Sequence, residues 1–213
     1  MKIAKCDRAE LSDREFNSVI REAAAEIVAG NLIVYPTETV YGIGADIFNE
    51  VAVKNLYIAK NRPFDMALSV AVSDRKMMEK IAVLNDNADK LIEAFLPGPL
   101  TIIIEKKPDV PDLVTSMSKK VGIRIPDHPV AMEIIKKTGP IVATSANVHS
   151  HPDATDISSA VKDLGASVSM YLDAGPSELK RPSTIVWLMN RDVEVIRQGA
   201  ITIEEIEAVL NAD

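Results

Sequence analysis

The segment Asn31-Leu-Ile-Val-Tyr-Pro-Thr-Glu-Thr-Val-Tyr-Gly-Ile-Gly44 decides the fold class. It begins with a short apolar run, Leu32–Tyr35, that a proline ends, and this pattern predicts a buried strand. The polar, glycine-containing residues that follow, Pro36–Gly44, predict a loop. An amphipathic helix with a capping-box start is predicted just before the strand, over Ser12–Gly30. A helix followed by a buried strand and a polar loop is typical of an α/β fold.

The same alternation continues in both directions along the chain, without a linker, a repeat or a low-complexity tract. Further strands are predicted at Leu68–Val72, Leu100–Glu105, Val121–Ile125, Ile141–Thr144, Val168–Leu172, Thr184–Leu188 and Val193–Arg197. Further helices are predicted at Asn49–Lys60, Asp74–Ile81, Asn87–Phe95, Pro129–Lys137, Ile157–Leu164 and Ile203–Leu210. We therefore expect one α/β domain over residues 1–213, a mixed sheet with helices packed around it.

Composition excludes several classes of protein. The chain has 213 residues, of which 47% are hydrophobic and 26% are charged, as in ordinary globular proteins. Its net charge of −7 excludes broad attraction to nucleic acid, so any anion must be bound by a local basic cluster. Cys6 is the single cysteine, which suits a reducing compartment and excludes an internal disulfide. The sequence has no signal-peptide pattern and no apolar run of membrane-spanning length, so we expect a cytoplasmic protein without a membrane contact.

Two polar loops come early in the chain. In Pro36–Gly44, the hydroxyls of Thr37 and Thr39 can bind a small polar ligand, or they can satisfy the backbone of their own turn. Lys60 and Arg62 lie two residues apart at the end of the next helix. A helix dipole favours cations there, which is a purely structural explanation. The pair also suits recognition of a phosphate or a carboxylate.

Two later strands carry further candidates. Arg124 stands inside the apolar run Val121–Pro126, and a buried arginine is costly unless it is paired. It therefore faces solvent, meets a carboxylate or binds an anionic ligand. Ser145 and Asn147 follow a predicted strand two residues apart, so they can bond one ligand from the same side or form an ordinary turn.

The motifs that most often bind phosphate or activate a nucleophile are absent. The sequence has neither a P-loop nor a dinucleotide-binding G-x-G-x-x-G, so lysine, arginine and hydroxyl side chains must hold any phosphate. Ser145 lacks the G-x-S-x-G context of a hydrolase nucleophile. His149 and His151 form a weak H-x-H pair, because zinc takes three or four ligands. His128 is expected to be structural.

Seven segments together resemble the YrdC-like family of threonylcarbamoyl-AMP synthases, in the family's order and spacing, from about residue 20 to residue 203. They are Pro36–Gly42, Lys60–Pro63, Pro97–Thr101, Val121–Pro129, Thr144–Asn147, Ser183–Val186 and Ile196–Ala200.

The resemblance implies a twisted α/β fold with a large, basic concave surface. It also implies a nucleotidyltransferase reaction in which L-threonine, bicarbonate and ATP give threonylcarbamoyl-AMP and pyrophosphate. Mg²⁺ would be bound through the ATP phosphates, with no metal ligand from the protein. The product would pass to a separate complex that makes N6-threonylcarbamoyladenosine (t6A) in tRNA. We expect a monomer.

The resemblance also assigns site residues. Those expected around threonine are Thr39, Arg124, Ser145 and Ser183, and those expected around ATP are Lys60, Arg62, Asn147, Thr155 and Arg197. The mechanism needs no enzyme nucleophile, because a carbamate oxygen of the substrate attacks the α-phosphorus. The protein would position the reactants and neutralise charge, Lys60 and Arg62 above all.

The sequence departs from the family's pattern at three places. Met66-Ala67 stands where a polar residue and proline are usual, Ala71 where some members have a histidine that helps to hold threonine, and His149-Ser150-His151 where Ser-Gly is common. These departures affect the expected ligand contacts and the assignment of Thr155. The extra C-terminal domain of longer family members is not seen in this sequence.

Two other functions are compatible with parts of the pattern. An RNA-binding module would use a basic concave surface to hold tRNA or double-stranded RNA, although the net charge and the few aromatic residues argue against it. A hydrolase would use His128 and Ser145 as a dyad, against which the missing nucleophile elbow argues.

Overall fold

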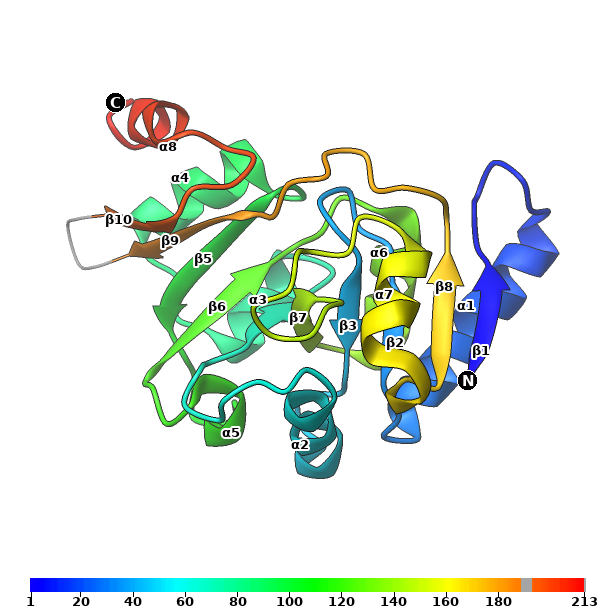
Figure 1. The fold of residues 1–213 in the computed structure, drawn as a ribbon. Helices are drawn as coiled ribbons and strands as arrows, with labels where there is room; N and C mark the ends of the chain where they lie inside the picture. The colour runs from blue at the N-terminus through cyan, green and yellow to red at the C-terminus, as the bar shows by residue number, and fades with distance from the viewer. Residues whose placement is uncertain (189–192, 213) are drawn as a thin grey trace.

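A twisted ten-stranded sheet runs through the described residues, 1–188 and 193–212, of the computed structural model (Figure 1). The strand order is β1-β8-β2-β3-β7-β4-β6-β5-β9-β10. The bounds are β1 Lys2–Lys5, β2 Ile33–Tyr35, β3 Gly42–Gly44, β4 Ser69–Ala71, β5 Leu100–Glu105, β6 Lys120–Arg124, β7 Ile141–Ser145, β8 Met170–Asp173, β9 Thr184–Leu188 and β10 Val193–Arg197. Parallel and antiparallel pairs occur together, which confirms the predicted mixed sheet.

The helices cover the sheet in two apolar layers. They are α1 Asp13–Val28, α2 Glu50–Ala59, α3 Arg75–Ile81, α4 Asp86–Phe95, α5 Asp112–Thr115, α6 Pro129–Thr138, α7 Ile157–Leu164 and α8 Ile203–Leu210. Helices α1 and α6 pack together over β1, β2 and β8 in one layer, and the larger layer holds the buried side chains of α2, α4 and α7. Among the described residues, no helix combines the length and the apolar character that a membrane span requires.

Local sequence signals explain where the helices begin. Ser12 and Glu15 form the predicted capping box of α1, in which each side chain bonds the backbone N–H of the other. Asn49 caps α2 by accepting from Val51 and Ala52, both at 3.1 Å. These side chains satisfy backbone groups that the helix itself leaves free, so the chain fixes the start of each helix locally.

The predicted helices and strands are confirmed, with ends that shift by at most about two residues at each terminus. The prediction of one loop over Pro36–Gly44 is wrong at its end, because Gly42–Gly44 forms β3 and pairs with β2. The ring of Tyr35 explains the glycines: a Cβ at Gly42 would lie 3.0 Å from it, and a Cβ at Gly44 would lie 3.1 Å from it. Strand β1 and the short helix α5 were not predicted.

The register of the central strands places polar residues on one face of the sheet. Ser69 of β4 pairs with Ala143 of β7 on one side and with Gly122 of β6 on the other. Paired residues on neighbouring strands point to the same face, and so do residues two apart along a strand. Arg124 and Ser145 therefore join this face, and the site described below lies on it.

Candidate active site

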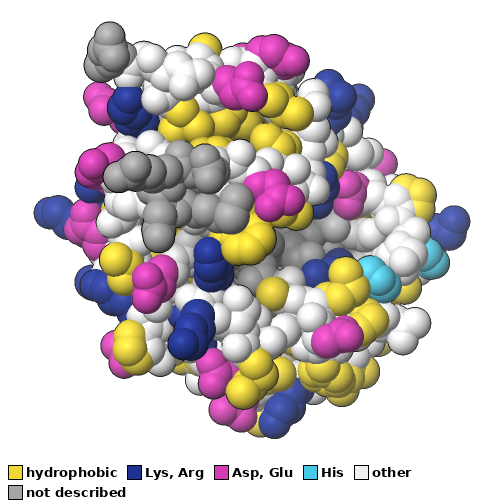
Figure 2. Space-filling model, turned by 90° about the vertical axis from the view of Figure 1, so that its left-hand side faces the viewer, with side chains coloured by type: hydrophobic (Ala, Val, Ile, Leu, Met, Phe, Trp, Pro, Cys, Tyr) yellow, Lys and Arg dark blue, Asp and Glu magenta, His cyan; other side chains and the backbone are white. Residues whose placement is uncertain are grey.

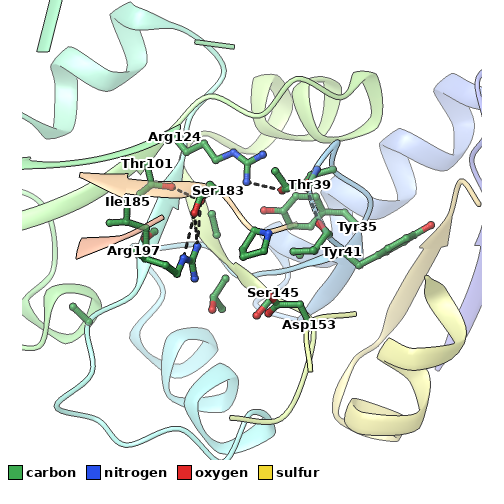
Figure 3. A pocket seen from close by; sticks show the side chains of 18 of the residues that line it. Tyr35, Thr39, Tyr41, Thr101, Arg124, Ser145, Asp153, Ser183, Ile185 and Arg197 are labelled. Carbon is green, nitrogen blue, oxygen red and sulfur yellow. Dashed lines mark hydrogen bonds between the residues drawn. The ribbon is translucent and has the colours of Figure 1, made fainter. Parts of the chain in front are cut away.

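A cavity of about 210 Å³ lies over this face of the sheet. Its lining comes from the 35–42 segment, the turn after α2, strands β4, β5, β6, β7, β9 and β10, the loop of Asp153 and the 182–183 segment (Figure 3). In the space-filling view the molecule is hollowed on the side of β9 and β10, and Lys and Arg side chains lie around the hollow (Figure 2). The charged side chains among the lining residues are Arg62, Arg124, Asp153 and Arg197.

Arg124 is buried, 9% exposed, and is held from three directions. Its guanidinium donates to Glu38 Oε1 at 2.6 Å, to Thr39 Oγ1 at 2.9 Å and to the carbonyl oxygen of Gly98 at 3.1 Å. Of the three alternatives left open by the sequence, the structure shows pairing with a carboxylate. A guanidinium has five N–H donors and these bonds use three, so two donors remain for a ligand.

The threonine pair of the 36–44 segment has a fixed hydrogen-bond direction. Thr37 donates its hydroxyl hydrogen to the carbonyl oxygen of Val40 at 2.6 Å. In the 2.9 Å contact between the two hydroxyls, Thr39 is therefore the donor and Thr37 the acceptor. The hydroxyls satisfy their own turn, which is one of the two alternatives from the sequence, and both threonines also line the cavity.

The turn after α2 presents Arg62 to the cavity. Asn61 has a left-handed φ of 48°, which ends the helix, and Arg62 N–H bonds back to the carbonyl oxygen of Tyr57 at 2.9 Å. The guanidinium of Arg62 donates to the carbonyl oxygens of Met66 at 3.1 Å and Ala67 at 2.8 Å. The departure from the family pattern at Met66-Ala67 thus still supplies two backbone acceptors that hold this arginine.

Arg197 is anchored to the same segment as Ser183. Its guanidinium donates to the Ser183 carbonyl oxygen at 2.9 and 3.2 Å, and the Ser183 hydroxyl lies 2.9 Å from that of Thr101. Burial lowers the pKa of Arg197, Asp153 raises it, and the neighbouring Arg124 lowers it. The three arginines are therefore held in place on backbone carbonyls before any ligand binds, as an anion site requires.

Lys60 is 2% exposed and supports the site from behind. Its ammonium group donates to the carbonyl oxygen of Ser145 and, at 2.6 Å, to that of Asn147. Burial above all, and then nearby Arg62, lower its pKa from 10.5 to about 8, against the opposite effect of Asp153 and Asp163. The Lys60 ammonium group, which the sequence suggested for phosphate recognition, thus holds the 145–147 turn through two carbonyl oxygens.

Ser145 forms the last wall of the site, and Asn147 supports it from behind. Ser145 Oγ donates to Asn147 Oδ1 at 2.5 Å, while the Asn147 amide nitrogen donates to the carbonyl oxygens of Val148 at 3.1 Å and His151 at 2.7 Å. Ser145 lines the cavity, whereas Asn147 lies behind it. The His149-Ser150-His151 loop thus contributes a backbone acceptor that orients the amide.

The structure brings together six of the nine residues expected at the site. Those that line the cavity are Thr39, Arg62, Arg124, Ser145, Ser183 and Arg197. Those that do not are Lys60, Asn147 and Thr155. Lys60 and Asn147 act on the backbone and side chain of Ser145, and the Thr155 carbonyl oxygen accepts from Ser177 N–H at 2.8 Å.

Sequence reasoning missed several lining residues, among them Tyr35, Ser69, Thr101 and Asp153. Ser69 pairs with Gly122, and the alternation of side chains along a strand places both on the polar face. This pattern would have identified Ser69 once the strand order was known. Asp153 lies beyond the expected Thr144–Asn147 segment, in a loop with no periodic signal. Ala71 is 1% exposed and packs into the layer of α1 and α6, outside the cavity lining.

The histidines do not form a catalytic or metal site in the described part of the chain. His128 Nδ1 accepts from Val130 N–H at 3.3 Å as the cap of α6, and burial lowers its pKa. It does not line the cavity with Ser145, so the dyad of a hydrolase is not assembled. His151 pairs with Asp163 at 3.1 Å, and the described residues contain no group of three or more His, Cys, Asp or Glu placed to hold a metal.

Comparison with known proteins identifies the family. A family model described as "Telomere recombination" and named for Sua5, YciO and YrdC matches residues 25–199. The chain belongs to the Sua5/YciO/YrdC family. This confirms the family inferred from the seven segments.

The relatives of this Sua5/YciO/YrdC family member that we compared are all named threonylcarbamoyl-AMP synthase, some of them as putative. A putative threonylcarbamoyl-AMP synthase of Methanocaldococcus jannaschii is 38% identical over 92% of this chain and 93% of the relative. One of Mycobacterium tuberculosis is 41% identical over 91% of this chain and 90% of the relative. A threonylcarbamoyl-AMP synthase of Bacillus subtilis is 38% identical over 90% of this chain but only 56% of its own length.

Solved structures agree with the fold. Sua5 of P. abyssi, determined in complex with L-threonine, matches 99% of this chain and 61% of its own with a TM-score of 0.93 and 32% identity. E. coli YciO matches 96% of this chain and 97% of its own with a TM-score of 0.83 and 21% identity, which supports the fold alone. The prediction of a YrdC-like α/β fold is confirmed.

Proposed function

We propose that this chain is an L-threonylcarbamoyladenylate synthase, which makes threonylcarbamoyl-AMP and pyrophosphate from L-threonine, bicarbonate and ATP. The observation that carries the proposal is the set of three pre-positioned arginines around one cavity, in a chain whose relatives bear the name of that enzyme. Ser145 has neither a G-x-S-x-G context nor a histidine beside it in the lining, so it is not set up as a nucleophile. The proposed reaction needs no enzyme nucleophile.

Arg124 is the residue proposed to take the carboxylate of threonine. Arg124 lines the cavity and keeps two unused N–H donors, and a guanidinium suits a carboxylate because two parallel hydrogen bonds can form. The fold neighbour from P. abyssi was solved with L-threonine, which supports an amino-acid site in this fold. Thr39, Ser145 and Ser183 supply hydroxyl oxygens around the same space.

Arg62 and Arg197 are the residues proposed to face the triphosphate. Both guanidinium groups rest on carbonyl oxygens, so they meet the phosphates without reorganising. Lys60 and Asn147 support the site indirectly, through the 145–147 turn. Thr155, which lies outside the lining, is proposed to contact ATP only at the edge of the site.

Mg²⁺ fits this donor set as an ion held by ATP rather than by the protein. The described residues offer no cage of acidic side chains, and Mg²⁺ commonly binds through phosphates and water. When bound, it would neutralise charge on the phosphates. The arginines would orient those phosphates and keep the α-phosphorus open to the carbamate.

The proposal extends to the fate of the product. Threonylcarbamoyl-AMP would be consumed by a separate complex that modifies tRNA to t6A, in the cytoplasm, with this chain acting as a monomer. A direct contact with tRNA or double-stranded RNA would then be transient, in keeping with the net charge of −7.

Product identification tests the proposed function. The purified chain is incubated with ATP, Mg²⁺, L-threonine and ¹⁴C-bicarbonate. The nucleotides are then separated by chromatography and identified by mass spectrometry. We expect a labelled adenylate with the mass of threonylcarbamoyl-AMP. Folded protein that gives only unlabelled AMP or ADP would contradict the proposal.

A further inference from the structure

One carboxylate lines the arginine-rich cavity. Among the described lining residues, Asp153 is the acidic one, and it faces the same space as Arg62, Arg124 and Arg197. It raises the pKa of both Lys60 and Arg197, so it lies within electrostatic range of each. A carboxylate is unfavourable in a site built for anions, unless it serves a cationic part of the ligand.

The hydroxyl of Ser145 is also an acceptor toward the cavity. Asn147 uses its amide nitrogen on the carbonyl oxygens of Val148 and His151, which identifies Oδ1 as the acceptor of the 2.5 Å bond from Ser145. The one hydroxyl hydrogen of Ser145 is thereby used. Toward a ligand Ser145 offers only lone pairs, as the Asp153 carboxylate does, and Figure 3 shows both at the same end of the pocket.

These acceptors suit an ammonium group better than a divalent ion. An ammonium group needs hydrogen-bond acceptors, and it carries one charge. A divalent ion needs about six oxygen ligands, whereas Ser145 and Asp153 together offer three side-chain oxygens. The Lys60 ammonium group lies behind Ser145 and donates to its carbonyl oxygen. It repels a bound divalent cation more strongly than a bound ammonium group.

We propose that Ser145 and Asp153 hold the amino group of the amino-acid substrate while Arg124 takes its carboxylate. This assignment rests on the proposed function and deepens it, because it makes Asp153 a substrate-binding residue and Asn147 a positioning residue that fixes the direction of the Ser145 hydrogen. The cavity then distinguishes an α-amino acid from other carboxylates by its acceptors.

The test compares two ligands on matched variants. L-threonine and (2S,3R)-2,3-dihydroxybutyrate share the carboxylate and the β-hydroxyl, and only threonine carries an ammonium group. Calorimetric titration of the wild type should show threonine binding at least about tenfold tighter. Asp153→Asn should weaken threonine at least about tenfold and change the dihydroxy acid by less than about twofold, because it removes only a charged acceptor. Asp109→Asn, an exposed change of the same kind outside the lining, is the control.

Two results would overturn the assignment. One is an equal loss for both ligands in Asp153→Asn. The other is an unchanged threonine affinity in that variant; if its ATP-dependent Mn²⁺ binding, measured by electron paramagnetic resonance, is lost at the same time, Asp153 serves the metal. A folded wild type that binds ATP but neither acid would instead contradict the proposed function itself.

Discussion

Glu38 Oε1 accepts a hydrogen bond from the Arg124 guanidinium at 2.6 Å, and both residues are more than nine-tenths buried. Removing one partner of such a pair leaves the other charge buried without compensation. We expect Glu38→Gln to lower the free energy of unfolding by about 3 kcal/mol, measured with urea. The exposed Glu93→Gln is the matched control. A loss no larger than in that control would show that the pair does not stabilise the fold.

Because the Lys60 ammonium group is buried, the free energy of unfolding varies with pH in the alkaline range. Its pKa is lowered from 10.5 to about 8, so between these values the unfolded chain binds more protons than the folded one. This group therefore raises the free energy of unfolding as pH increases across that window, by up to about 1.4 kcal/mol per unit. The rise should be present in the wild type and in the exposed control Lys137→Met, and missing from Lys60→Met. Parallel pH profiles in all three proteins would contradict the lowered pKa.

Gly122 lies against Ser69 and Thr101, two residues that line the cavity. A Cβ there would lie 2.9 Å from Ser69 Oγ and 3.4 Å from Thr101 Cγ2, so a methyl group forces the serine to move. We expect Gly122→Ala to weaken threonine binding about fivefold or more and to cost about 1–3 kcal/mol of stability, as overpacking does. Adding Ser69→Ala should recover part of both losses. If the second change recovers neither, the contact does not limit the site.

Arg62 should matter for turnover much more than for stability. It is half-buried, and its partners are two backbone carbonyls in an exposed turn, so the fold loses little when it is replaced. We expect Arg62→Ala to reduce the rate of pyrophosphate release about a hundredfold or more. The free energy of unfolding should change by less than about 1 kcal/mol. Arg21→Ala, an exposed arginine of α1, provides the control, and near-normal turnover in Arg62→Ala would remove this residue from the mechanism.

The fold was largely predictable because its signals are local. Caps such as Ser12 and Asn49, and apolar runs such as Leu100–Glu105, lie within a few residues of what they specify. Strand β3 was missed because glycine is depleted in strands, and only the packing of the Tyr35 ring explains Gly42 and Gly44.

The site was predictable in its residue types but not in its pairings. The sequence showed that Arg124 needs a partner or a ligand, yet Glu38 is 86 positions away along the chain. Lys60 was predicted to contact phosphate, and one of its two acceptors, the Asn147 carbonyl oxygen, is 87 positions away. Contacts of this kind depend on the register of the sheet, which no local pattern specifies.

Pyrophosphate release from ATP, followed with threonine and bicarbonate each left out in turn, tests whether the chain is a threonylcarbamoyladenylate synthase. We expect rapid release only when both are present with Mg²⁺, and release at background when either is missing. Release that continues at the full rate without threonine, from folded protein, would contradict this function.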